Sequence, residues 1–237
     1  MLITHKKHFA TGVVLAVGFF GLFFLLISPV FGDGRNGLQY ADDIFNKLSK
    51  GSSYFAPKVA KHNEKFMGKQ FVVNIKFNDP EEARISANLF AVAGAKVEPR
   101  ENTLKIEGDL GSVLSAVIRD ADLMYKNEGE KVNAAYGYDE KKVMKDWWTT
   151  LSKVDKAFKA EKQFENAKMV SEVYKKVVEP GYNFYKIEAQ KVTDRVGTMS
   201  GLLIFYVIYT MWWGYALYHL FEGIGLTTKK VKVKKEI

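Results

Sequence analysis

The chain of 237 residues carries a formal net charge of +8, with 26 % charged and 47 % hydrophobic residues, and it contains no cysteine. This composition excludes a disordered chain and a transporter with many membrane spans. Without cysteine there is no disulfide framework, no attached c-type haem, no thiolate-bound zinc or iron–sulfur cluster and no cysteine nucleophile.

The positive charge is concentrated at the two ends of the chain. Residues 33–195 hold 28 basic and 25 acidic residues, a net of +3, and the short tails supply the remaining +5. Basic residues beside apolar segments set the orientation of a membrane protein. We interpret the charge as a topology signal and expect no nucleic-acid partner.

The first apolar run, Phe9 to Phe31, directly follows the basic residues Lys6 and Lys7. The run is longer than the roughly 7–15 residues of a signal-peptide core, so we expect a retained membrane span. The triplet Val30-Phe31-Gly32 would permit cleavage. In that alternative one anchor remains and the mature N-terminus lies outside.

A helical connector is expected after the first span, over residues 32–70. Leu38 to Lys50 carries an apolar stripe at helical spacing, and Gly51 would end this helix. A second short helix is expected from Pro57 to about Phe66.

Residues 71–138 show the clearest alternation of strand and helix patterns. Phe71 to Phe77 alternates apolar and polar residues, which predicts a half-buried strand, and Asp79-Pro80 predicts the start of a helix. Further elements are predicted in this order: strands over 95–99 and 103–107, a helix after Asp109 and a fourth strand over 131–138. The order strand, helix, strand, strand, helix, strand is that of a ferredoxin-like (βαββαβ) domain.

The segment 139–195 is predicted to be long helix with a break at Pro180-Gly181, resuming at Tyr182 and continuing into the second span. Apolar residues such as Trp147 and Phe158 recur at three- and four-residue spacing. Two interpretations stay open: an amphipathic helix covering the exposed face of the sheet, or a coiled-coil stalk that dimerises.

The second apolar run, Val196 to Phe221, contains no charged residue and exceeds the roughly 20 residues that cross a bilayer. Five lysines lie in the tail between Thr227 and Ile237. We therefore expect a two-pass protein of a bacterial inner membrane, with both termini cytoplasmic and residues 33–195 extracytoplasmic.

The expected fold class is an α+β membrane protein in which two transmembrane helices flank an extracytoplasmic ferredoxin-like domain with additional long helices. Its expected parts are the cytoplasmic N-terminus 1–8, transmembrane helix 9–31, connector 32–70, ferredoxin-like domain 71–138, helical segment 139–195, transmembrane helix 196–221 and basic cytoplasmic tail 222–237.

Aromatic and small residues make the second span a candidate docking helix. Tyr and Trp usually lie at membrane interfaces, yet several here fall in the middle of the run, where their polar tips need protein partners. Gly197 and Gly201 form a GxxxG motif that permits close helix contact. The candidate partner-binding residues are Gly197, Gly201, Tyr206, Tyr209, Trp212 and Trp213. Packing of the two spans on each other, with Gly12 and Ala16 in the first span, is the alternative.

Two histidines would lie at similar depth in an in–out–in topology. His8 begins the first span and His219 ends the second, so the pair are candidate axial ligands of a b-type haem. Alternatively, His8 belongs to the basic cluster and His219 faces a partner. No metal-ligand spacing, nucleotide loop or catalytic signature is present, so we expect neither a metal site nor an enzyme.

These observations favour a non-catalytic accessory or scaffold subunit of a larger inner-membrane complex, with an extracytoplasmic protein-interaction domain. Its expected partners are other integral membrane proteins or a second copy of the chain. The alternatives are an extracytoplasmic ligand-binding or sensing module that signals through partner helices, and a small b-haem membrane subunit. No cofactor is expected in the favoured interpretation.

Overall fold

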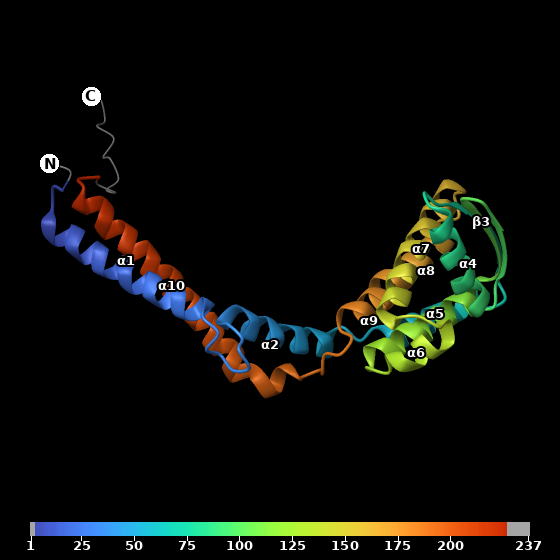
Figure 1. Ribbon diagram of the computed structural model, residues 1–237, viewed down its shortest axis with the longest axis horizontal. Helices are drawn as coiled ribbons and strands as arrows, with labels where there is room; N and C mark the ends of the chain where they lie inside the picture. The colour runs from blue at the N-terminus through green and yellow to red at the C-terminus, as the bar shows by residue number, and fades with distance from the viewer. Residues whose placement is uncertain (1–2, 227–237) are drawn as a thin grey trace, which may run out of the picture. The chain divides into compact units, whose positions relative to one another are not determined.

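The computed structural model describes residues 3–226 and divides into two compact units. We call residues 1–45 and 191–237 the span unit, and residues 46–190 the sheet unit. Figure 1 labels most of the helices of both. One helix, α2 (Gly37–Ser52), begins in the span unit and ends in the sheet unit.

The span unit is built from two long helices, α1 (Lys6–Ile27) and α10 (Val196–Gly223), which lie side by side (Figure 1). A short 3-10 helix, η3 (Val192–Arg195), leads into α10. Backbone N–H groups of Thr4 and His5 donate to the carbonyl of Gly223, at 2.9 and 3.0 Å, so the two helices are antiparallel. The N-terminal end of α1 and the C-terminal end of α10 therefore lie on the same side of the pair.

Both helices are long and apolar enough to span a membrane. Only 6 % of the most apolar window of α1, and none of that of α10, is buried. This exposure is unlike that of an apolar helix in the core of a soluble domain, where most of the window is covered by other elements.

The first helix ends earlier than expected. The apolar run continues to Phe31, but α1 begins at Lys6 and ends at Ile27. Pro29 restricts the residue before it to extended conformations, and Ser28 has φ −78° and ψ 149°. The helix therefore cannot continue through Val30 and Phe31.

From its first strand onward, the sheet unit follows the expected order of strand, helix, strand, strand and helix. Asp79 accepts a hydrogen bond from the N–H of Glu81, and Asp109 accepts one from Ser112, so both predicted helix starts are confirmed. The elements are α3 (Ala56–Asn63), η1 (Glu64–Phe66), β1 (Gln70–Lys76), α4 (Pro80–Val92), β2 (Lys96–Arg100), β3 (Thr103–Asp109) and α5 (Leu110–Tyr125).

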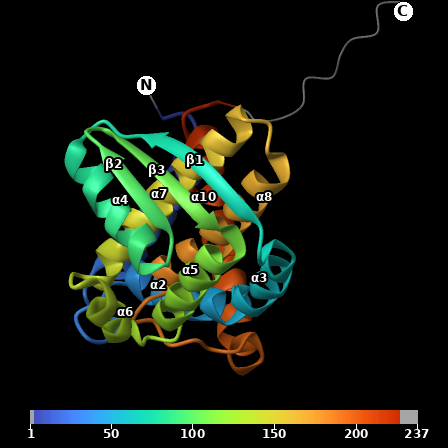
Figure 2. The ribbon, with the colours of Figure 1, turned by 90° about the vertical axis from the view of Figure 1, so that its right-hand side faces the viewer.

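The three strands form an antiparallel sheet in the order β1-β3-β2 (Figure 2). Ile106 of β3 pairs with Val73 of β1 and with Val97 of β2. Strands β1 and β2 are joined through α4 and separated in the sheet by β3, which is a split βαβ arrangement. The alternating burial along β1 confirms the half-buried strand predicted from its sequence.

The expected fourth strand, over 131–138, is wrong, because this segment forms helix α6 (Gly129–Tyr136). Val132 and Tyr136 stand four residues apart and are both buried, which is helical spacing. Gly137, with φ 79°, ends the helix in the left-handed conformation. Residues 3–226 thus contain three strands, and a complete ferredoxin-like domain is not formed by them.

The expected long helix is divided at a different place. Its parts are α7 (Glu140–Ala160), α8 (Phe164–Val173), the π-helix η2 (Tyr174–Val178) and α9 (Glu179–Asn183). The chain turns at Lys162, which has φ 61°. Pro180 does not break the helix, and it lies in the first turn of α9, directly after the π-helix η2. The helix ends at Asn183 and does not continue into α10.

Helices α4 and α7 cover the same face of the sheet (Figure 2). Trp147 of α7 and Phe90 of α4 meet edge to face at 5.2 Å in the core. The segment 139–179 therefore packs onto the domain, but not on the exposed sheet face that it was expected to cover.

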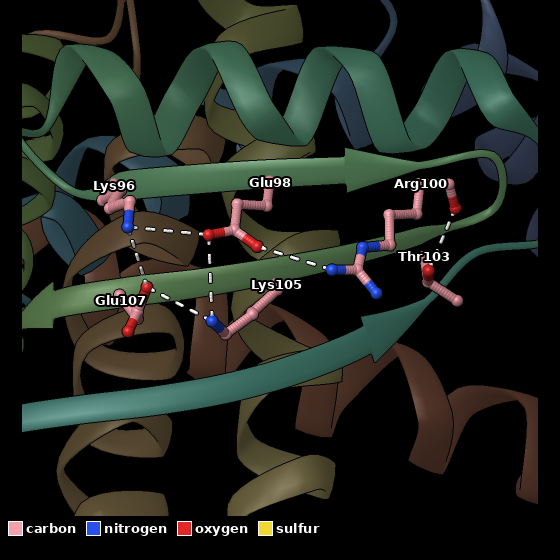
Figure 3. A network of polar contacts seen from close by, with 6 residues as sticks. All are labelled: Lys96, Glu98, Arg100, Thr103, Lys105 and Glu107. Atoms are coloured by element: carbon pink, nitrogen blue, oxygen red, sulfur yellow. Dashed lines mark hydrogen bonds and ion pairs between the residues drawn. The ribbon is translucent and has the colours of Figure 1, made fainter.

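The other face of the sheet carries charged side chains instead of a covering helix (Figure 3). Glu98 of β2 lies 3.8 Å from Lys105 of β3, and Lys96 of β2 lies 3.5 Å from Glu107 of β3. Opposite charges on neighbouring strands are favourable cross-strand pairs and keep an exposed sheet soluble. This face therefore needs no covering helix.

Candidate membrane docking face

Aromatic side chains of α10 hold α1. The indole N–H of Trp212 donates to the carbonyl of Leu15 at 3.0 Å, and the hydroxyl of Tyr209 donates to that of Phe19 at 3.3 Å. The Tyr209 and Phe19 rings stack with centroids 4.2 Å apart. Polar tips in an apolar environment need such acceptors, so these contacts fix the pair.

Glycines bring the two backbones close together at the end where both termini leave. A Cβ added to Gly12 would lie 2.7 Å from the backbone nitrogen of Leu220, and one added to Gly223 would lie 2.7 Å from the Cα of Phe9. A side chain at Gly12 or Gly223 would clash with the facing backbone, so the helices can be this close only with glycine at both positions.

The six predicted partner-binding residues separate into two groups. Tyr209 and Trp212 bind α1 as described, and Trp213 lies 4.7 Å from the ring of Phe19. Half of the predicted docking residues therefore lie in the contact between the two spans. For these three residues the alternative interpretation, packing of the spans on each other, describes the structure. The other three do not contact α1: Gly197, Gly201 and Tyr206.

Gly197 and Gly201 begin an open stripe along α10. An added Cβ at either glycine would meet no atom within 4 Å. With the helical period, the stripe continues through Ile204, Ile208 and Tyr215, whose exposed fractions are 59 %, 59 % and 63 %.

Tyr206 lies on the opposite side of α10 from this stripe, near the middle of the helix. Its side chain is 62 % exposed. Its hydroxyl has no hydrogen-bond partner among residues 3–226, whereas the hydroxyl of Tyr209, three residues later, has Phe19.

The structure brings the two candidate haem ligands into direct contact. The Nδ1 atoms of His8 and His219 are 3.0 Å apart, and the ring centroids are 5.1 Å apart. Axial ligation of a haem by two histidines places the iron and the macrocycle between the ligating nitrogens. No such space separates these rings, so the two residues as placed do not fit a haem.

The sheet unit contains one buried amine, that of Lys50, which is 3 % exposed. Its Nζ donates to the Asn127 side chain and to the Phe184 carbonyl, each at 3.0 Å, and to the carbonyl of Ile187. Burial lowers the pKa of Lys50, and the charge of Glu188 acts in the opposite direction. The amine thus ties the end of α2 to the segment after α9.

A shallow hollow of about 320 Å³ lies between α7 and α9. It is lined by Met144, Lys145, Trp148, Glu179, Tyr182 and Asn183. Trp148 is 41 % exposed, and its indole N–H donates to the Glu179 carboxylate at 3.4 Å. The adjoining π-helix is of a kind that often occurs at functional sites.

No protein-family model, curated protein sequence or solved structure matches this chain.

Within the described part of the chain, no three histidine or carboxylate side chains converge as a metal-ligand set. Sequence reasoning missed two features, the buried Lys50 and the exposed Trp148. Lys50 ends an amphipathic helix, where a lysine is ordinary. Trp148 is adjacent to the core residue Trp147, and only the helical period distinguishes their sides.

Proposed function

We propose that this protein is a non-catalytic accessory subunit of a larger membrane assembly, anchored by α1 and α10 and docked to partner helices through α10. The observation that carries the proposal is Tyr206, a polar-tipped side chain exposed near the middle of an apolar helix.

The comparison of Tyr206 with Tyr209 supports this function. Both are on α10, but only the Tyr209 hydroxyl reaches an acceptor within the described residues. In hydrocarbon, a hydroxyl without a partner costs several kcal/mol because no water is present to replace it. A helix of another membrane protein would supply the acceptor that α1 does not.

The open glycine stripe supports the same type of partner. Gly197 and Gly201 leave room beside α10, and small residues at this spacing let a second helix approach closely. The stripe and Tyr206 lie on different sides of the helix, so α10 would be surrounded by partner helices on the sides that α1 leaves open.

The proposed location is a bacterial inner membrane, with both termini cytoplasmic and the sheet unit extracytoplasmic. The lysines beside both spans support this orientation, as does the antiparallel pairing that brings the N-terminal end of α1 and the C-terminal end of α10 to one side. The sheet unit would be the protein-interaction domain of the subunit.

Co-purification tests the proposal. The full chain is isolated from its native membrane in mild detergent, and associated proteins are identified by mass spectrometry. We expect integral membrane partners in fixed proportion. Gly201→Leu should remove them, whereas the matched change Gly214→Leu, at a glycine that is also open but lies outside the stripe, should retain them. A solitary homodimer, or equal loss with both variants, would contradict the proposal.

A finer test uses the two tyrosines. Tyr206→Phe should weaken partner association by about 0.6 kcal/mol, roughly threefold. Tyr209→Phe should leave association unchanged, since its hydroxyl already binds Phe19. The readout is energy transfer between the labelled subunit and its identified partner in lipid nanodiscs.

A second candidate function, extracytoplasmic ligand sensing, is favoured by the hollow beside Trp148. Exposed aromatic side chains with one carboxylate, here Glu179, suit a small ligand with an apolar body and a polar group. A thermal-shift screen of the full chain would detect it. A hit that Trp148→Ala abolishes supports sensing, and a screen without hits counts against it.

A further inference from the structure

The two imidazoles that end the helix pair point their nitrogens at each other. Nδ1 of His8 on α1 lies 3.0 Å from Nδ1 of His219 on α10. The ring centroids are 5.1 Å apart, close to this distance plus the two ring radii, so the two nitrogens lie between the ring centres. When both rings are neutral, one nitrogen donates and the other accepts.

The surrounding backbone holds the two rings in place. Gly12 packs against Leu220 and Gly223 packs against Phe9, so close backbone contacts lie on either side of the pair. The Thr4 and His5 N–H groups close the end of the pair on the Gly223 carbonyl. Two donor atoms held on separate rigid helices are a preorganised chelate.

An uncompensated carboxylate lies in the same region. Glu222, one turn after His219, is 9 % exposed, and its Oε1 has no hydrogen-bond partner among the residues that the structure describes. A buried carboxylate without a partner is costly, and a nearby cation reduces that cost. The negative charge therefore favours a cation at this end of the helices.

We propose that His8 and His219 bind a divalent transition-metal ion of the zinc class through their Nδ1 atoms, and that the ion replaces the hydrogen bond between the rings. Two nitrogens on a tetrahedral zinc ion, each about 2.0–2.1 Å from the metal, stand about 3.3 Å apart. The observed separation is 3.0 Å, and binding requires both rings to turn so that their Nδ1 lone pairs converge on the ion. Imidazole ligands select zinc, nickel or copper over magnesium and calcium.

The site has two protein ligands, and water completes the coordination. No third histidine or carboxylate converges on it within residues 3–226, and the nearest other imidazole, that of His5, has its centroid 6.4 Å from that of His8. The bound ion would join α1 to α10 at the end from which both termini leave. This inference does not depend on the proposed function.

The test is a Zn²⁺ titration of the full chain, purified in detergent without a polyhistidine tag. We expect one equivalent to bind by calorimetry. His8→Ala and His219→Ala should each lower the affinity roughly hundredfold, because each destroys the chelate. The control is His62→Ala, which removes an exposed histidine lying 3.3 Å from Glu172 in the sheet unit and should leave Zn²⁺ binding unchanged.

A spectroscopic measurement on the unaltered chain covers the case in which a variant misfolds. Cu²⁺ added at one equivalent should give an electron paramagnetic resonance spectrum with coupling to two imidazole nitrogens. Coupling to one nitrogen or none, or Zn²⁺ binding that is unchanged in correctly folded His219→Ala, would overturn the proposal. The pair would then be a hydrogen bond between helices and nothing more.

Discussion

The sheet unit and the span unit treat their apolar and polar groups in opposite ways. In the sheet unit, Trp147 and Phe158 are fully buried, and the uncovered sheet face carries ion pairs between Glu98 and its lysine neighbours. In the span unit, large apolar side chains face outward, with Val14 71 % and Met211 68 % exposed. The first surface is suited to water and the second to hydrocarbon.

The comparison also indicates where the proposed partner would bind. In the sheet unit, the buried hydroxyl of Tyr136 donates to Asp120 at 2.6 Å. In the span unit, Tyr206 finds none among the described residues. Paired charges allow the sheet face to stand in water without a covering helix, whereas the hydroxyl of Tyr206 is the group that the proposed partner would satisfy.

The largest effect is expected in the core of the sheet unit. Trp147 is fully buried and its indole N–H donates to Tyr136 at 3.3 Å, whereas Trp148, the next residue, is 41 % exposed. Trp147→Ala should lower the free energy of unfolding by about 3–5 kcal/mol through the cavity it leaves. Trp148→Ala should cost less than about 1 kcal/mol.

The measurement is denaturant unfolding of the full chain in mild detergent, followed by far-ultraviolet circular dichroism. Similar losses for the two variants would mean that α7 does not present Trp147 to the core as described, and would weaken the contrast between the units.

The next effect concerns the contact between the two spans. Gly12→Leu forces a side chain against the backbone of Leu220, so we expect the helix pair to lose about 1–3 kcal/mol. Gly214→Leu has no atom within 4 Å of its new Cβ and should change the pair little. Cysteines introduced singly into α1 and α10 would report their separation by cross-linking, since the natural chain has no cysteine. Unchanged cross-linking in Gly12→Leu would contradict the described packing.

A pH dependence is expected from Tyr136 in the sheet unit. Burial and the neighbouring Asp120 carboxylate raise its pKa well above the ordinary value of 10.0. Above about pH 10 the unfolded chain loses this proton while the folded chain keeps it, so stability falls as pH rises, by up to about 1.4 kcal/mol per pH unit for this one group.

Tyr136→Phe should remove that part of the alkaline loss. At neutral pH the variant should be less stable by about 1–3 kcal/mol, because Asp120 loses the hydroxyl that donates to it. Unfolding measured between about pH 8 and 11, with tyrosinate absorbance as a second signal, tests both statements. A slope unchanged by the substitution would show that other groups cause the alkaline loss.

Elements with local signals were predicted well from the sequence. Asp79 and Asp109 are helix caps whose side chains bind backbone N–H groups two or three residues later, so the signal and the interaction lie in the same few residues. The apolar alternation over β1 likewise needs only its own residues. The two long apolar helices follow from length and composition alone.

The errors arose where tertiary contacts decide the outcome. Val132 and Tyr136 fit a strand by residue type, but burial against α5 and α7 made the segment a helix. Gly181 looked like a helix breaker and instead permits close packing, since a Cβ there would lie 2.8 Å from the Ala121 carbonyl oxygen. A similar depth of His8 and His219 was predicted from topology, but their direct contact depends on glycines that the sequence alone does not pair.

The smallest effect tests how the aromatic residues of α10 are divided between α1 and a partner. Trp212→Phe keeps a ring over Gly18 but removes the N–H that donates to Leu15 at 3.0 Å. Hydrogen bonds between membrane helices contribute about 0.6 kcal/mol on average, so the pair should be slightly weaker. The same loss is expected with the chain alone and in its assembly, because the hydrogen bond from Trp212 to Leu15 lies within the chain.

Tyr206→Phe should differ from the unaltered chain only when the partner is present. If Trp212→Phe weakened only the assembly, Trp212 would contact the partner and not α1. The proposed assignment of the α10 aromatic residues would then be wrong.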